Sequence, residues 1–187
     1  MISSRQEYKH YLEADRRALY RDGARPWLFI LDPIWSFQRL LRKVEYYTNC
    51  KRSWVWIPYL VYLRFRLKRM KLLLGFSIPI NVIGPGLCIV HRGPIVISDY
   101  ARIGSNLRIN IGVVIGESEG PTNVPRMGND VTIEPGCKIF GKIEIADGIH
   151  IGANSVVSKS FLEPNIVIAG VPAKKIRQKP GYSDLRE

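Results

Sequence analysis

The sequence predicts a mainly β protein, a solenoid with six-residue sides that follows an N-terminal α-helical segment. In the second half of the chain an aliphatic residue or Met recurs every six positions, at Met127, Ile133, Ile139, Ile145, Ile151 and Val157. The same register occurs upstream at Ile97, Ile103, Ile109 and Ile115. Because a helix repeats its buried face every 3.6 residues and a strand every two, a period of six indicates a coil with flat six-residue sides.

A second set of inward positions lies four residues further along each unit. Its members are Ala101, Leu107, Val113, Val131, Cys137, Ile143 and Ile149. Two inward side chains per side would fill a narrow core. Glycine follows the aliphatic residue at Ile103-Gly104 and Ile151-Gly152, where the backbone has to turn a corner without a bulky Cβ.

Residues 1–74 predict helices. Apolar side chains recur at roughly helical spacing at Tyr8, Tyr11, Leu12 and Leu19. The pattern breaks at Asp32-Pro33 and resumes over 34–43, and a third helix is expected from about Pro58 to Leu74.

Positive charge is concentrated in this helical segment. Residues 1–74 contain 16 Lys and Arg against 6 Asp and Glu, whereas 75–187 contain 12 against 10. Residues 54–63 are almost wholly apolar, and five basic residues follow within 64–71. Two readings stay open: a helix packed in the protein or its oligomer, or a surface that associates with anionic membrane lipids. A nucleic-acid partner is not expected, because no recognition module is present.

The remaining composition predicts a cytoplasmic chain, with peripheral association on the inner face of the membrane as the open alternative. Cys50, Cys88 and Cys137 are odd in number and far apart, which is typical of reduced thiols. The first 25 residues are charged throughout, unlike a signal peptide, and no 18-residue run is free of charge.

Three motifs between residues 75 and 176 resemble a known family. They are Ile83-Gly84-Pro85-Gly86-Leu87, Val90-His91-Arg92-Gly93 and Ala169-Gly170-Val171-Pro172-Ala173-Lys174. Together they resemble the hexapeptide-repeat acyltransferases, in the branch shared by serine O-acetyltransferases and capsular or exopolysaccharide O-acetyltransferases. The resemblance implies a left-handed parallel β-helix over 75–176, followed by a C-terminal tail at 177–187. It also implies a homotrimer and acetyl-CoA as donor. No metal is expected, because the three histidines lack the clustering of metal ligands.

The repeat is interrupted once. Ile115 and Met127 keep the register at twice the usual spacing, but 117–126 have the composition of a loop. The resemblance implies that the active site lies between two subunits, near this loop.

His91 is the predicted catalytic residue. The chain contains two other histidines, His10 and His150, which we expect at the surface. We expect His91 to replace an aliphatic residue of the inward register. A neutral imidazole can take the proton of an acceptor hydroxyl as it attacks the thioester, and a backbone N–H near Gly116 would stabilise the oxyanion. Ser77, Asn110, Glu117 or a backbone carbonyl are the candidates for orienting His91.

The resemblance also assigns binding residues. It places the pantetheine arm against Gly116, Pro135 and Ala153, and the far end of the donor beside Pro172, Ala173, Lys174 and Lys175. The lysines would supply charge for the phosphates. For the acceptor we expect Arg92, Asn110, Glu117 and Arg126.

Departures from the serine enzymes led to the predicted acceptor. Those enzymes typically have Asp-His where this chain has Val90-His91, and Arg-His-Pro-Lys where it has 123–126. We therefore expect a saccharide acceptor, a sugar hydroxyl in capsule, exopolysaccharide or other envelope glycan synthesis, with serine acetylation as the alternative. A non-enzymatic scaffold is a third reading. A zinc hydratase is not favoured, because the three histidines do not cluster in the sequence.

Overall fold

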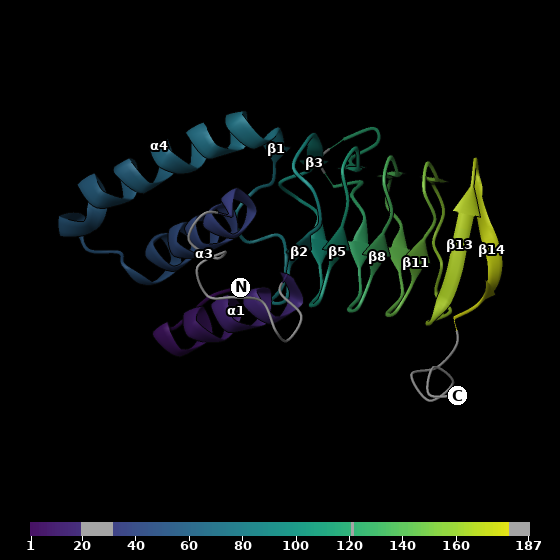
Figure 1. The fold of residues 1–187 in the computed structure, drawn as a ribbon, viewed down its shortest axis with the longest axis horizontal. Coiled ribbons are helices and arrows are strands. Elements are labelled where there is room, and N and C mark those ends of the chain that lie inside the picture. The colour runs from purple at the N-terminus through teal and green to yellow at the C-terminus, as the bar shows by residue number, and fades with distance from the viewer. Residues whose placement is uncertain (20–31, 121, 180–187) are drawn as a thin grey trace.

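The computed structural model describes residues 1–19, 32–120 and 122–179, and helices precede a three-sided coil of parallel strands (Figure 1). The N-terminal segment is helical as predicted. Its elements are α1 (Arg5–Leu19), α3 (Pro33–Cys50), the short 3-10 helix η1 (Trp54–Trp56) and α4 (Ile57–Leu74). None of the helices in the described part of the chain is long and apolar enough to cross a membrane.

Local signals explain where the helices begin and end. The Asp32 carboxylate accepts hydrogen bonds from the backbone N–H groups of Ile34 at 2.7 Å and Trp35 at 3.3 Å, which caps the start of α3. Pro33 occupies the first turn, where a missing N–H has no cost. At the end of α4, Gly75 adopts a left-handed conformation with φ of 77°, which stops the helix before the first strand.

The strands stack on three sides of the coil. The first side contains β1 (Phe76–Ser77), β3 (Ile95–Ile97), β6 (Val114–Gly116), β9 (Lys138–Phe140) and β12 (Val156–Val157). The second side contains β4 (Arg102–Ile103), β7 (Arg126–Met127) and β10 (Glu144–Ile145). The third side contains β2 (Cys88–Ile89), β5 (Arg108–Ile109), β8 (Thr132–Ile133), β11 (His150–Ile151) and β13 (Ile166–Gly170). A last strand, β14 (Ala173–Gln178), pairs antiparallel with β13 and lies at the end of the coil away from the helices (Figure 1).

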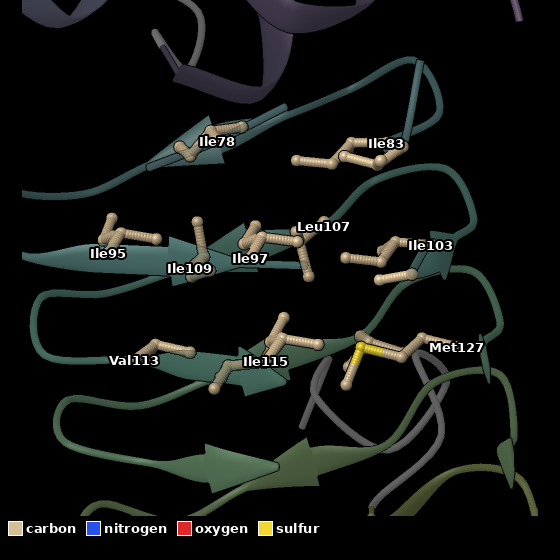
Figure 2. Close-up of a cluster of buried hydrophobic side chains, with 14 of the residues drawn as sticks. Ile78, Ile83, Ile95, Ile97, Ile103, Leu107, Ile109, Val113, Ile115 and Met127 are labelled. Atoms are coloured by element: carbon tan, nitrogen blue, oxygen red, sulfur yellow. The ribbon is translucent and has the colours of Figure 1, made fainter. Parts of the chain in front are cut away.

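The core confirms the six-residue register. Every residue of both predicted inward sets is buried, and Ile109, Ile115, Ile133 and Ile139 are fully so. Figure 2 shows part of this core, with Ile97, Ile109 and Ile115 among the side chains stacked in layers inside the coil. The glycine after Ile103 is required for close packing, because a Cβ on Gly104 would come within 2.6 Å of the Gly128 carbonyl oxygen in the next coil.

The helices cover the first coil of the solenoid. Phe37 of α3 packs on Phe76 of β1 with ring centroids 5.0 Å apart, and Gln38 donates a hydrogen bond to the Leu87 carbonyl at 2.7 Å. Leu63 and Leu67 of α4 belong to the same hydrophobic core as the coil. The helical segment therefore closes the end of the core that the first coil would otherwise expose.

Candidate active site

The corners between the third and first sides stack into one edge of the coil, and the turn between β13 and β14 continues it. This histidine edge consists of residues 90–94, 110–113, 134–137, 152–155 and 170–172. Backbone hydrogen bonds connect successive corners, from the Gly112 N–H to the Pro94 carbonyl at 2.7 Å and from the Gly136 N–H to the Ile111 carbonyl at 2.9 Å. The Asn154 N–H continues the series to the Pro135 carbonyl at 2.8 Å. Residues far apart in the sequence are thus aligned along this edge.

His91 lies on the first corner of the histidine edge, and its side chain is exposed. The prediction that it occupies an inward register position is wrong. Ile89 pairs with Ile109, twenty positions later, whereas Val96 pairs with Val114, eighteen positions later. Two extra residues are therefore accommodated in the corner before β3, so Ile89 takes the inward position and His91 faces solvent.

Within the described residues, no hydrogen bond or ion pair holds the His91 imidazole. Two of its predicted orienting residues, Asn110 and Ser77, form no hydrogen bond with it in the described part of the chain. The Asn110 side chain is buried and donates to Glu134 Oε2 at 3.2 Å, and Ser77 lies on β1, paired with Val96. Arg92, beside His91, is exposed on the same corner.

Part of the predicted donor-binding set lies together. Pro135, Ala153 and Pro172 follow one another along the histidine edge, in the three corners farthest from His91. Gly136 has a φ of 79°, and a Cβ there would collide with Asn154 Oδ1, so this corner requires glycine.

The lysines at the end of this edge differ from each other. Lys175 Nζ forms an ion pair with Glu163 at 2.6 Å. The carboxylate therefore neutralises the positive charge that was predicted to bind phosphate. Lys174 is exposed on β14, and Ala173 beside it is buried. Of the two predicted phosphate ligands, Lys174 has the more accessible ammonium group.

Gly116, Glu117 and Arg126 lie on a different edge. Together with the loop between β6 and β7 they form the loop edge, at the corner between the first and second sides. The described loop residues are held by hydrogen bonds from Ser118 N–H to the Asn123 carbonyl at 3.0 Å and from Asn123 N–H to the Gly120 carbonyl at 3.1 Å. Roughly 10 Å of extended strand separates the two edges across the first side, so a single chain does not bring these residues to His91.

Arg126 borders a separate hollow. It lines a pocket of about 370 Å³ with Thr122 and Val124 of the loop, and Lys142 and Glu144 of the next coil. None of five pockets found on the described part of the chain is lined by His91. The site around His91 is therefore an open edge in the single chain.

The sequence analysis missed a group of interacting side chains that connects the histidine edge to the outer face of the third side. His150 Nε2 lies 3.2 Å from Glu134 Oε1, and the other oxygen of Glu134 accepts the Asn110 amide. Lys138 Nζ also donates to the Gly112 carbonyl at 2.6 Å. The available signal in the sequence was the spacing of eighteen residues between Thr132 and His150, which pair across β8 and β11. Within the described residues, no group of three or more His, Cys, Asp or Glu side chains could hold a metal ion.

The sequence is similar to curated serine acetyltransferases. It is 38% identical over 111 residues to the enzyme of Mycobacterium tuberculosis, a match that covers 58% of this chain and 48% of that protein. It is 35% identical over 103 residues to that of Buchnera aphidicola, covering 54% and 39% respectively. The chain thus spans about half the length, or less, of these curated relatives. No model of a known protein family matches the sequence.

Solved structures extend the similarity over almost the whole chain. The serine acetyltransferase of Neisseria gonorrhoeae superposes with a TM-score of 0.76 at 28% identity, over 98% of this chain and 72% of that one. A Brucella abortus serine acetyltransferase in complex with coenzyme A superposes with a TM-score of 0.71 at 27% identity, over 94% and 70%. The chain has the left-handed β-helix fold of the hexapeptide-repeat acyltransferases. The predicted fold is therefore confirmed.

The comparisons correct the predicted acceptor. We expected a sugar hydroxyl because Val90 and residues 123–126 depart from the serine enzymes, but the curated relatives and solved structures described above are serine acetyltransferases. The predicted role in capsule or exopolysaccharide synthesis is contradicted. Two local departures were given more weight than similarity along the whole coil.

Proposed function

We propose that this chain is an acetyl-CoA-dependent O-acetyltransferase that transfers acetyl to the hydroxyl of L-serine, with His91 as general base. The observation that carries the proposal is the exposed imidazole on an edge whose other corners include Pro135, Ala153 and Pro172. The relatives named serine acetyltransferases, one of them solved with coenzyme A, support both the acceptor and the donor.

The chemistry follows from the position of the imidazole. A serine hydroxyl is a poor nucleophile while it keeps its proton, and a neutral imidazole at the edge can accept that proton as oxygen attacks the thioester carbon. The tetrahedral intermediate then collapses and expels the CoA thiolate, which takes the proton back from the imidazolium. Direct transfer of this kind needs no acyl-enzyme.

The donor is proposed to lie along the histidine edge. The narrow pantetheine arm would lie against Pro135 and Ala153, of which Ala153 is exposed, and Lys174 provides an exposed positive charge near the end of the coil for a phosphate. Because Lys175 is paired with Glu163, we assign it a lesser part in holding the donor.

The complete site is proposed to form between subunits of a homotrimer. The loop edge with Gly116 and Glu117 is separated from His91 within one chain, so an oxyanion donor near Gly116 has to come from a neighbour. A three-fold arrangement places the loop edge of one subunit against the histidine edge of the next, and repeats the same contact three times.

The proposal is tested by following free thiol released from acetyl-CoA with L-serine as acceptor. His91→Ala should reduce turnover at least about 100-fold, because the general base is removed. His150→Ala is the matched control, since His150 lies on the outer face of the third side, paired with Glu134, and should retain activity. Full activity of a folded His91→Ala protein would refute the catalytic assignment. Turnover with other hydroxyl compounds but none with serine would refute the acceptor.

A further inference from the structure

The side of α4 that faces away from the rest of the chain is apolar and exposed. Trp54 before the helix and Leu73 near its end are each 79% exposed, and Phe65 at its middle is 59% exposed. Other exposed apolar side chains of this segment are Val55, Trp56, Ile57, Val61, Tyr62 and Leu72. An exposed apolar stretch of this kind marks an interaction surface.

The exposed side chains form a stripe. Ile57, Val61 and Phe65 recur every four residues and Leu72 follows two turns later, so they share one side of the helix. We call Trp54 and this stripe the outer face of α4. The buried side chains of α4 are Leu63, Leu67 and Leu74, on the opposite side. Figure 1 shows α4 running along the outside of α3, with its N-terminal end extending away from the coil.

Basic side chains border the stripe on both sides. At 100° per residue, Arg64 and Arg69 fall along opposite borders of the outer face, Lys68 falls among its apolar side chains, and Arg66 lies farther round the helix than Arg69. All four residues are exposed. Long basic side chains in this arrangement can keep their charge at a polar boundary while their stems and the central stripe enter an apolar layer.

The whole segment carries positive charge only. Residues 51–74 contain seven basic residues, Lys51, Arg52, Arg64, Arg66, Lys68, Arg69 and Lys71, and no Asp or Glu. A partner for this face therefore has to combine negative charge with an apolar interior. The surface of an anionic bilayer has both properties.

A second copy of the same face is a poorer partner. In an isologous contact the basic borders of two helices would face each other, and residues 1–74 as a whole carry 16 Lys and Arg against 6 Asp and Glu. Like charges brought together in this way oppose association. Tryptophan and tyrosine near the stripe, at Trp54, Trp56 and Tyr62, are also the side chains enriched where protein meets lipid headgroups.

We propose that the outer face of α4 binds this protein to the surface of membranes that contain anionic lipid. The helix lies in the plane of the headgroups, with Phe65 and the stripe in the apolar boundary and the basic borders at the phosphates. The inference does not depend on the proposed acetyl transfer, because no residue of the outer face belongs to the histidine edge or the loop edge.

The test is co-sedimentation of the full chain with vesicles of phosphatidylcholine alone and of phosphatidylcholine mixed with phosphatidylglycerol. The wild-type chain should bind the mixed vesicles, weakly bind the neutral ones, and release as salt is raised. The variant Arg66→Gln/Lys68→Gln/Arg69→Gln should bind the mixed vesicles roughly 100-fold more weakly, because each basic group near the surface contributes about a fivefold factor. The matched control is Lys142→Gln/Lys159→Gln/Arg177→Gln, which removes the same charge from exposed positions of the coil and should bind as wild type does.

Four outcomes would overturn the proposal. They are absence of wild-type binding, equal binding to both vesicle types, equal loss in both triple variants, and a fall in oligomeric mass for Phe65→Ser without vesicles. The last result would make the outer face an interface between copies. Thiol release from acetyl-CoA, measured on the same triple variants without lipid, should be unchanged, so failure of membrane binding is separable from failure of the enzymatic proposal.

Discussion

Arg42 joins the helices to the coil. Its fully buried guanidinium forms an ion pair with Asp15 of α1 at 2.8 Å and with Glu45 of its own helix at 3.1 Å. It also donates to the carbonyl oxygens of Ile83 at 2.9 Å and Gly84 at 2.6 Å in the first coil. Burial alone would lower the pKa of Arg42, but the two carboxylates outweigh it and hold the pKa above its ordinary value. The guanidinium is therefore charged throughout the accessible pH range.

Asp15 completes this connection. Its Oδ1 accepts hydrogen bonds from the backbone N–H groups of Gly86 at 2.9 Å and Leu87 at 2.8 Å. A charge this deeply buried is tolerated only when its partners are present. Three segments far apart in the sequence thus depend on one another.

Replacing Arg42 should destabilise the fold strongly. Arg42→Met leaves two buried carboxylates without a counter-charge, and we expect the free energy of unfolding to fall by about 3–5 kcal/mol. Urea denaturation followed by circular dichroism measures the change. Arg39→Met replaces an exposed residue of the same helix and should shift the free energy of unfolding by less than about 0.5 kcal/mol. Equal effects of the two substitutions would contradict this account.

At the scale of the element, a coil side needs only a few residues because its neighbours complete it. Most strands are two or three residues long, and those within a stack pair with the strand above and the strand below. Burial of the inward aliphatic side chains of the strands provides most of the stabilisation. This is why a six-residue period is readable without any knowledge of the pairing partners.

Core and surface positions of the same side should respond differently to truncation. Ile139→Ala removes a fully buried side chain from β9 and should cost about 2–5 kcal/mol of unfolding free energy. Val96→Ala on β3, whose side chain is 42% exposed, should cost less than about 1 kcal/mol. Guanidinium denaturation of both variants distinguishes them, and a cost at Val96 as large as that at Ile139 would mean that the outward positions are also packed.

The corner containing His91 shows where element-scale reasoning from sequence fails. Counting back eighteen residues from Ile109 reaches His91, but the structure pairs Ile109 with Ile89. A corner can take up extra residues without disturbing the strands on either side, because only the strands are bound by pairing. The period therefore locates strands reliably and corners less well.

At the scale of the whole molecule, the two groups proposed for catalysis lie on opposite edges of the first side. Gly116 ends β6 beside the loop, whereas His91 precedes β3. Neither edge by itself carries both a base and the loop. An assembly in which neighbours combine their edges accounts for this separation.

Mixed trimers test that account. His91→Ala subunits keep the loop, and subunits lacking residues 118–124 keep His91, so each homotrimer should be inactive. Random co-assembly of equal amounts should restore about one quarter of the wild-type activity, because one site in four pairs an intact histidine with an intact loop from its neighbour. Light scattering confirms the trimer, and the thiol-release assay measures the recovery. No recovery in mixed trimers would place the complete site within one chain.

The sequence by itself determined the inward ladder of aliphatic residues, the helical start and the interrupting loop, because each depends on contacts or propensities within a few residues. Only the tertiary structure decided that His91 faces solvent and that Gly116 lies on another edge. It also decided that Asn110 donates a hydrogen bond to Glu134, that Lys175 forms an ion pair with Glu163, and that Arg42 binds the first coil. These relations join residues 12 or more positions apart, and the period that identifies the fold does not specify them. The physical reason is that a repeating coil encodes its core locally, while its edges and its caps are set by long-range pairing.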